Sequence, residues 1–239
     1  MTPPLAPLPP DFAETRDELH RLAVYVISPA QRLVNGEIIL RATPGGFSTF
    51  EFGAGRVIGV DGAQLVVDGT RHPISTLKEA ARLAGIAADV AQQEQFDVPP
   101  HGDLDQPLAV DAEAARALGA WYAFATGVLD ELRAEAEQGE DASIVRIWPE
   151  HFDLAIDAGD GEAGRRATYG ASPGDRDHPE PYLYASPWAG RIDAFFDAPG
   201  FKGAARTRAD LAAEVDPRRA AIAFLREARD RVRRGTGMK

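Results

Sequence analysis

The fold class is decided by residues 37–74, EIILRATPGGFSTFEFGAGRVIGVDGAQLVVDGTRHPI. Short runs of β-branched and aromatic residues alternate here with glycines, a pattern typical of strands joined by turns. Asp61-Gly62 and Asp68-Gly69 are tight-turn pairs between such runs. The stretch therefore predicts an antiparallel meander.

A helical pattern precedes the meander. Apolar residues from Phe12 to Val26 share one helical face, and Asp11 is a candidate N-terminal cap. Proline cannot donate a backbone hydrogen bond, so Ser28-Pro29 is expected to end or kink this helix.

Residues 76–95 return to a helical pattern, which closes the first half. The second half has the same order of elements, and Asp111 is expected to cap its long first helix. A second β region extends from residue 144 to about residue 210. The last helix is expected to start at Asp216-Pro217, a cap followed by proline in the first turn.

This order predicts an α+β protein of two halves, each an antiparallel sheet covered by helices. The predicted organisation is an extended proline-rich arm over 1–10, an N-terminal α+β half over 11–96, a proline-rich connector over 97–110 and a C-terminal α+β half over 111–239.

Composition bounds the classes of function. A chain of 239 residues can bury its own core, and the absence of cysteine excludes disulfides, thiolate metal sites and cysteine nucleophiles. The net charge is −11 and the basic residues are scattered, so no basic stripe is available for a nucleic-acid backbone. No apolar run approaches the roughly 20 residues of a membrane span, and no secretory signal is evident. We expect a soluble cytoplasmic protein without nucleic-acid or membrane partners; the sequence does not indicate its oligomeric state.

Residues 170–174, GASPG, match the G-x-S-x-G pattern of serine hydrolases. In that motif the residue after the serine donates its backbone N–H to the oxyanion hole. Pro173 has no N–H, so Ser172 is not predicted to be a nucleophile.

A candidate metal site is formed by five side chains in two clusters: His151, Asp153, Asp175, His178 and Glu180. If a hairpin brought the clusters together, imidazoles and carboxylates could bind a divalent metal such as zinc, manganese or iron. The alternative is that His151 and Asp153 are the polar positions of a half-buried strand, followed by a polar hairpin loop. His20 and His72 have no partner at ligand spacing and are predicted to lie at the surface.

Aromatic residues are concentrated between residues 148 and 188. The candidate ligand-binding residues are Trp148, Tyr169, Tyr182, Tyr184 and Trp188. On strands these rings could form the wall of a pocket, with hydroxyl groups and indole N–H groups as polar anchors. The alternative is that most of them fill the core between sheet and helices. Tyr182 and Tyr184 are two residues apart, so they are expected to share one face of a strand.

Four stretches carry a resemblance: SPAQRLVNGEIILRATPGGFSTFEF over 28–52, WPEHFDLAIDAG over 148–159, YGASPGD over 169–175 and HPEPYLYASPW over 178–188. They resemble a family of actinobacterial proteins to which no reaction, ligand or catalytic residue is assigned. The resemblance implies a cytoplasmic bacterial protein and transfers no functional residue.

The leading hypothesis is a small-molecule-binding protein with an aromatic-lined pocket in its C-terminal half. One alternative is a metal-dependent hydrolase that uses the histidine and carboxylate cluster. The other is a protein-interaction or scaffold module without a small-molecule site. The sequence identifies no catalytic residue.

Overall fold

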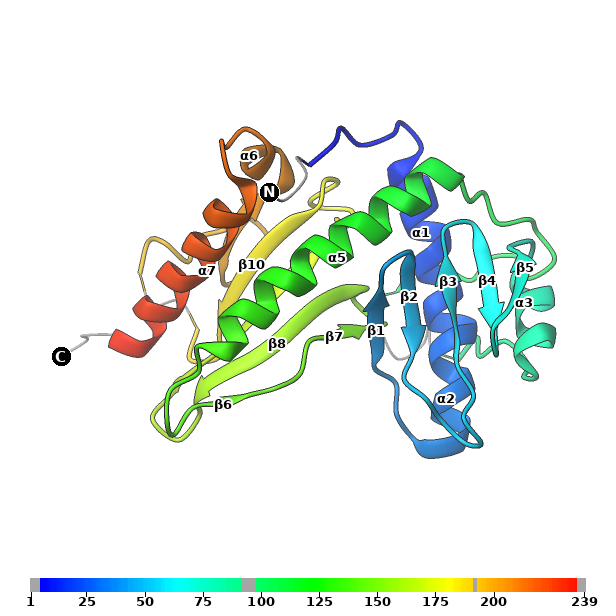
Figure 1. Cartoon of the computed structure of the whole chain (residues 1–239), viewed down its shortest axis with the longest axis horizontal. Helices are drawn as coiled ribbons and strands as arrows, with labels where there is room; N and C mark the ends of the chain where they lie inside the picture. Colours follow the sequence, from blue (N-terminus) through cyan, green and yellow to red (C-terminus); the bar gives the residue numbers. More distant parts are fainter. Residues whose placement is uncertain (1–4, 92–97, 191–192, 236–239) are drawn as a thin grey trace. The chain divides into compact units, whose positions relative to one another are not determined.

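The computed structural model describes residues 5–91, 98–190 and 193–235, and it confirms the α+β class (Figure 1). The chain forms two compact units. We call the first the N-terminal unit (Leu8–Ala123 and Arg146–Asp153) and the second the C-terminal unit (Met1–Pro7, Phe124–Val145 and Leu154–Lys239).

The strands are antiparallel, as the sequence predicts. They are β1 (Leu40–Thr43), β2 (Gly46–Thr49), β3 (Ile58–Asp61), β4 (Gln64–Val67), β5 (Thr70–Pro73), β6 (Asp141–Ala142), β7 (Arg146–Trp148), β8 (Asp153–Asp160), β9 (Arg165–Ser172), β10 (Tyr182–Pro187) and β11 (Ala204–Thr207). Within the described residues they belong to one sheet in the order β11-β10-β9-β8-β7-β1-β2-β3-β4-β5, with β6 paired to β8. The prediction of a separate sheet in each half is therefore not confirmed.

The predicted meander forms β1 to β5 of the N-terminal unit. Asp68 and Gly69 both have positive φ angles, 49° and 82°, the conformation of the hairpin turn that Asp-Gly favours. Gly62, with φ 58°, begins the turn between β3 and β4.

The helices of the N-terminal unit are α1 (Phe12–Leu22), η1 (Ala23–Ile27), α2 (Ser28–Asn35), α3 (Leu77–Ala84) and the first half of α5 (Ala112–Ala134). Asp111 caps α5 as predicted, because its side chain accepts from the backbone N–H of Ala114 at 2.8 Å. Asp11 precedes α1 without a capping side-chain hydrogen bond. α3 ends well before residue 91 of the predicted helix over 76–95, because Gly85 ends it in the left-handed conformation, and residues 92–95 of that prediction lie outside the described residues.

Pro29 does not end the first helix. Its ring would crowd the carbonyl of Tyr25, four residues earlier, and it cannot donate to that carbonyl. Residues Ala23–Ile27 adopt a wider π-helical turn, and the Tyr25 carbonyl accepts instead from the backbone N–H of Asp89 at 2.9 Å. The helical path therefore continues to Asn35.

The core of the N-terminal unit closes around Phe152, which has the left-handed φ angle of 54°. This conformation is costly for a bulky residue, so neighbouring groups must hold it. The Tyr122 hydroxyl donates to the Phe152 carbonyl at 2.6 Å, and the rings of His20 and Phe47 pack against the Phe152 ring with centroids 4.9 and 5.1 Å away.

His20 is a half-buried member of this cluster, so its predicted surface position is wrong. Its ring is parallel to that of Phe152, and its Nε2 donates to the Pro149 carbonyl at 2.8 Å. Burial, and to a lesser degree the charge of Arg16, lower the pKa of His20 to about 4.

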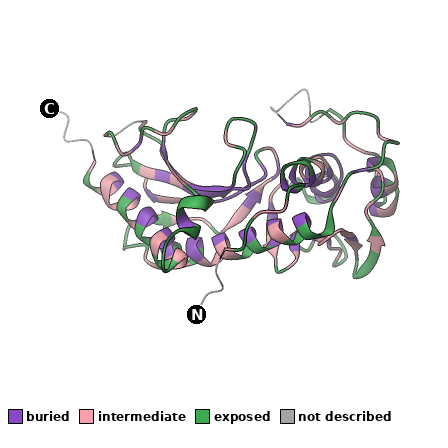
Figure 2. Ribbon diagram, turned by 90° about the horizontal axis from the view of Figure 1, so that it is seen from above, coloured by how far each residue is buried: buried purple, intermediate pink, exposed green. Residues whose placement is uncertain are grey.

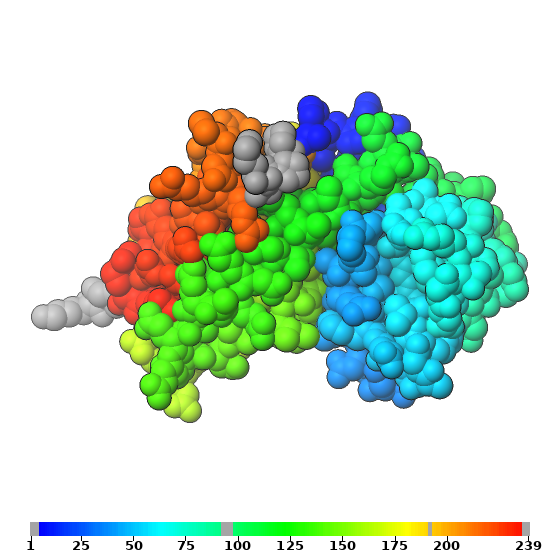
Figure 3. Space-filling view, in the orientation of Figure 1, coloured from blue at the N-terminus to red at the C-terminus, as the bar shows by residue number. Residues whose placement is uncertain are grey.

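In the C-terminal unit, the second half of α5 and α7 (Pro217–Arg234) cover one face of the sheet; α6 (Arg208–Ala212) precedes α7. Figure 2 shows the buried residues of α7 on the side toward the strands. Figure 3 shows α7, in red, packed along the end of α5, in green. Asp216 caps α7 as predicted, by accepting from the Arg219 N–H at 3.0 Å.

Ion pairs join the end of α5 to α7. Glu135 contacts both Arg226 and Arg229, and Glu131 contacts Arg218 and Arg226. The hydrogen bonds from Arg226, followed by those from Arg229, hold the pKa of Glu135 down at about 2. The arginine-rich helix is therefore paired with carboxylates of its own unit.

The first prediction concerns His20 and acid stability. The unfolded chain protonates this residue near pH 6.5, whereas the folded chain does so at about 4. Between these values only the unfolded form gains the proton, so the free energy of unfolding should fall as pH drops from about 6.5 to about 4. The loss is up to about 3 kcal/mol, reduced by the water that reaches the half-buried ring.

A His20→Phe variant keeps a ring to stack on Phe152 but cannot be protonated. Urea unfolding measured at pH 7 and pH 4.5 should show a smaller loss of stability in this variant than in the parent protein. His72→Phe, in the edge strand β5, controls for removal of a histidine elsewhere. An equal loss in the parent and His20→Phe would contradict the prediction.

The second prediction concerns Glu135. A carboxyl with a lowered folded-state pKa stabilises above its unfolded-state pKa and loses that effect as pH falls through the folded-state value. Glu135→Gln should lower the stability at pH 7 by about 1 kcal/mol or less, since the pair is partly exposed, and the melting temperature by about 2–4 °C. The difference from the parent should shrink as pH falls below 4.5. Glu162→Gln, in the exposed turn before β9, makes the same charge change and should leave the melting temperature nearly unchanged.

Candidate ligand-binding face of the C-terminal unit

Side chains alternate along β8, β9 and β10, so the sheet of the C-terminal unit has two different faces. The register places Ile156, Tyr169 and Ala185 in one row, and all three are buried on the side of α5 and α7. The neighbouring positions point the other way. We call this second side the outer face; its residues are Asp157, Arg166, Thr168, Gly170, Tyr182, Tyr184, Ser186 and Trp188.

Trp188 is the most exposed aromatic side chain of the outer face, at 60%. Its backbone N–H donates to the Arg166 carbonyl at 3.0 Å, which places the two residues opposite each other at the end of the β9–β10 hairpin. The guanidinium carbon of Arg166 lies 4.9 Å from the centre of the Trp188 ring. Arg166 in turn pairs with Asp141 at 3.2 Å.

The indole of Trp188 is also held at its edge. Its Nε1–H donates to Oγ1 of Thr168 at 3.1 Å, and the Thr168 hydroxyl donates to Oδ1 of Asp157 at 2.7 Å. These three residues are on the outer face of three neighbouring strands. The ring is therefore exposed to solvent and fixed in position at the same time.

A tyrosine cluster occupies the other end of the outer face. It consists of His178, Tyr182, Tyr184 and Phe201, whose ring centroids are 5.0–6.3 Å apart in the contacting pairs. The expectation that Tyr182 and Tyr184 share one face is confirmed. Gly170 lies directly opposite Tyr184, and a Cβ at Gly170 would stand 2.4 Å from the Tyr184 ring. The absent side chain lets Tyr184 lie across the sheet.

Asp175 organises the loop between β9 and β10. Its Oδ1 accepts from the backbone N–H groups of Asp177 and His178 at 2.8 and 2.7 Å, and its Oδ2 accepts from the Tyr182 hydroxyl at 2.9 Å. The carboxylate thus folds a polar turn and anchors a tyrosine. Ser172 is 4% exposed, and its Oγ accepts from the Gly174 N–H, in keeping with a structural role.

The candidate metal ligands are distributed between the two units. His151 is exposed and Asp153 buried in the N-terminal unit. Asp175, His178 and Glu180 belong to the C-terminal unit, where His178 Nδ1 is 3.7 Å from Asp175 Oδ1 and Glu180 is exposed. Across residues 5–91, 98–190 and 193–235, no three histidine, aspartate or glutamate side chains gather closely enough to hold a metal ion. The geometry gives the metal hypothesis no support.

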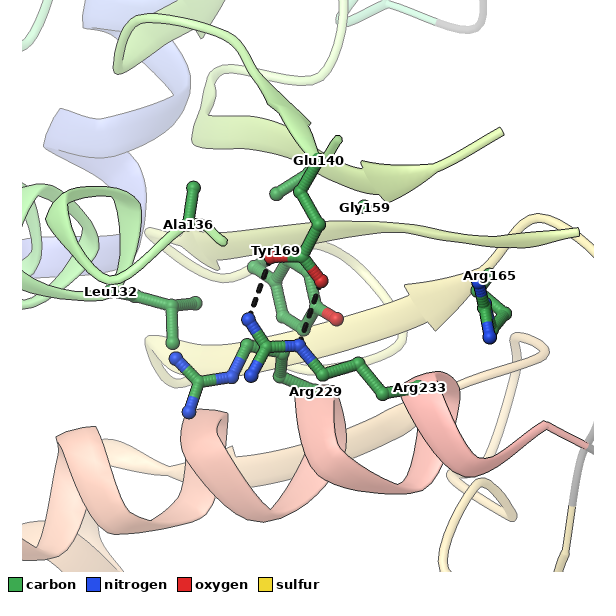
Figure 4. Close-up of a pocket in the computed structure, with 9 residues that line it drawn as sticks. Leu132, Ala136, Glu140, Gly159, Arg165, Tyr169, Arg229 and Arg233 are labelled. Carbon is green, nitrogen blue, oxygen red and sulfur yellow. Dashed lines mark hydrogen bonds and ion pairs between the residues drawn. The ribbon is translucent and has the colours of Figure 1, made fainter. Parts of the chain in front are cut away.

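Tyr169 points to the opposite side of the sheet from Tyr182 and Tyr184. Together with Leu132 of α5 and Arg229 and Arg233 of α7, it lines a small cavity of about 10 Å³, and Glu140 bonds Arg233 across the opening (Figure 4). Burial raises the pKa of its hydroxyl well above the usual range. A space of this size holds about one water molecule, so Tyr169 is a core residue rather than part of a ligand pocket.

Trp148, the remaining aromatic candidate, belongs to the N-terminal unit, where the guanidinium of Arg146 stacks on its ring at 5.0 Å. The five predicted rings therefore do not form one pocket. Three of them, Tyr182, Tyr184 and Trp188, share the outer face. The aromatic pattern of the sequence does not reveal their partners Asp157, Arg166, Thr168 and Phe201. Strand alternation would have found the first three; nothing in the sequence singles out Phe201.

No protein family model, curated protein or solved structure matches this chain. In the described ranges, no helix is both long and apolar enough to cross a membrane. The role of the outer face therefore has to be inferred from its own geometry and chemistry.

The third prediction tests the hydrogen bonds that hold Trp188. Thr168→Val keeps the side-chain shape but removes both the acceptor for the indole and the donor to Asp157. We expect a destabilisation of about 1 kcal/mol and a more mobile Trp188 ring. With 5-fluorotryptophan in the three tryptophan positions, the ¹⁹F resonance of Trp188 should sharpen and move toward that of the free amino acid, while that of buried Trp121 stays in place.

Ser186→Ala is the matched control, because this hydroxyl is on the same face but donates to the Lys202 carbonyl instead. It should leave the Trp188 resonance unchanged. An unchanged Trp188 resonance in Thr168→Val would show that the indole is not held by this hydrogen bond.

Proposed function

We propose that the protein is a non-catalytic binding protein, and that its small-molecule ligand stacks on the outer face of the C-terminal unit. The observation that carries the proposal is that the Trp188 ring is both exposed and held in one orientation. A tryptophan exposed to 60% forgoes most of the stabilisation that burial of its ring would provide. Here Arg166 and Thr168 nevertheless hold the ring in one orientation.

Fixing a recognition side chain before binding favours affinity, because the ordering cost is already met in the free protein. Aromatic rings are well suited to this, since they offer a large contact area with few rotatable bonds. The partly exposed Tyr184 supplies a second ring on the same face of the same strand. The outer face therefore has the features of a preformed stacking surface.

The polar groups of the outer face favour binding over catalysis. The Thr168 hydroxyl donates to Asp157, both oxygens of Asp175 accept hydrogen bonds from the loop and Tyr182, and the Ser186 hydroxyl donates to a backbone carbonyl. The Thr168 oxygen lies beside a carboxylate but also accepts from the Trp188 indole, and the carbonyl that Ser186 contacts is not a base, so these hydroxyls hold neighbouring groups in place rather than act as nucleophiles. Their arrangement supports a role in holding rings in place.

The fourth prediction tests this proposal with fluorotryptophan-labelled protein. A panel of compounds that can stack on an aromatic ring, composed of nucleosides, aromatic alcohols and saccharides at millimolar concentration, should contain at least one that shifts the Trp188 resonance in a saturable manner. The resonance of Trp121 should not move. Trp188→Ala should weaken binding of that compound about 10-fold or more, because the variant loses a ring stack worth roughly 0.5–1.5 kcal/mol and, in addition, the apolar area buried against the ring.

Trp148→Phe is the matched control, because Trp148 carries an arginine stack of the same kind in the other unit. It should leave binding unchanged. If no compound of the panel shifts Trp188, or if binding depends on Trp148 and not on Trp188, the proposed site is wrong.

A further inference from the structure

The charges around Trp188 limit the ligand to a neutral molecule. Arg166 already lies against the Trp188 ring, so a second cation stacked on the exposed side would be repelled by the guanidinium and would compete for the same π-electrons. An anion would meet the carboxylate of Asp157, which the Thr168 hydroxyl ties to the edge of the indole. A cation attracted by Asp157 meets Arg166, and an anion attracted by Arg166 meets Asp157, so the two groups offset each other and a charge gives a ligand no advantage over a neutral one at this end of the outer face.

Asp157 also sets the hydrogen-bonding character of the ligand. Its Oδ1 accepts from Thr168, which orients the carboxylate, and no residue in the described part of the chain donates to its Oδ2. An ionised carboxylate only accepts hydrogen bonds, and such charge-assisted bonds are stronger than neutral ones. The best partner is a neutral molecule that combines a flat apolar face for the indole with a hydroxyl group at its edge.

The spacing of the exposed Trp188 and the partly exposed Tyr184 bears on the length of the ligand. Their Cα atoms are four residues apart on one face, about 13 Å at the rise of a β-strand. Thr168 and Ser186, which are paired across β9 and β10 and both carry a hydroxyl group, form a hydroxyl row between them. Ring, hydroxyl row and ring thus follow one another along β10 and the residue after it, a spacing that suits a ligand of more than one ring.

We infer that the ligand of the outer face is a neutral oligosaccharide, an inference that rests on the proposed function. The apolar faces of successive sugar rings stack on Trp188 and Tyr184, and a sugar hydroxyl donates to Oδ2 of Asp157. Thr168 acts as a positioning residue, because it orients both the indole and the carboxylate. The affinity of the complex grows with the number of sugar rings until both aromatic side chains are covered.

The fifth prediction compares hexasaccharides of equal length and different charge by isothermal titration calorimetry and by the Trp188 ¹⁹F resonance. The neutral probes are glucose hexamers with α-1,4, β-1,4 or β-1,3 linkages. The charged probes are hexagalacturonate and the chitosan hexamer. At least one neutral hexamer should bind 10-fold or more tightly than glucose and than either charged hexamer.

Two variants test the Asp157 hydrogen bond and the Tyr184 stack separately. Asp157→Asn retains an oxygen for Thr168 but removes the charge, and it should weaken the neutral hexamer about 10-fold while leaving the thermal stability near that of the parent. Tyr184→Leu keeps an apolar side chain over Gly170. It should remove the advantage of the hexamer over glucose, while the Trp188 ¹⁹F shift that the hexamer causes persists, a split that a general loss of folding would not produce.

The remaining outcomes overturn the inference in distinguishable ways. Binding of a charged hexamer with equal or higher affinity would contradict the charge argument. If nucleosides or aromatic alcohols shift Trp188 and no hexasaccharide does, the binding function stands and the oligosaccharide is excluded. If neither group of compounds shifts Trp188, both the inference and the proposed function fail.

Discussion

In β9 and β10, successive side chains must point to opposite faces of the sheet, so one register decides both what α5 and α7 can bury and what the outer face presents. Tyr169, Ala171 and Leu183 are nearly inaccessible on the helix side. The positions between them place Thr168, Gly170 and Tyr184 on the other side. A slip by one residue would bury Thr168 and expose Tyr169. The packing of the helices therefore fixes the outer face, although no helix residue needs to touch it.

A single glycine, Gly170, determines how the Tyr184 ring lies on the outer face. Gly170 weakens β9 as a strand residue, because glycine loses more conformational freedom on folding than other residues do. In return, the Tyr184 ring occupies the space where a Cβ would be. The ring then contacts both Tyr182 and Phe201. The same sheet position thus lowers local stability and creates a broad aromatic surface, a combination expected where a surface serves recognition rather than folding.

Much of the fold follows from local sequence signals. The Asp-Gly turns, the meander, the caps at Asp111 and Asp216 and the shared face of Tyr182 and Tyr184 are all readable from residues a few positions apart. Pairings between segments that are far apart in the sequence cannot be predicted in this way. The pairing of Leu40 with Ile147 brings residues 146–153 back to the N-terminal unit. The carbonyl of Tyr25 meets the N–H of Asp89, and His20 meets Phe152. Each of these joins segments that no periodicity connects, so the continued helix at Pro29 and the buried histidine could not be foreseen.

Local sequence patterns also predict the candidate site only in part. Aromatic composition pointed to residues 148–188, but rings from two units and from both faces of one sheet were grouped together, because composition carries no information about direction. Trp188 differs from the other candidate rings in its contacts. Arg166 lies against the face of its ring, Thr168 accepts from its indole N–H, and Asp157 accepts from the Thr168 hydroxyl. Arg166 both steadies the indole and opposes a second cation, while Asp157 both orients Thr168 and opposes an anion. The residues that hold the ring in place are thus the same residues that would select the charge of the ligand we propose, so a variant that loosens the indole should also relax ligand selectivity.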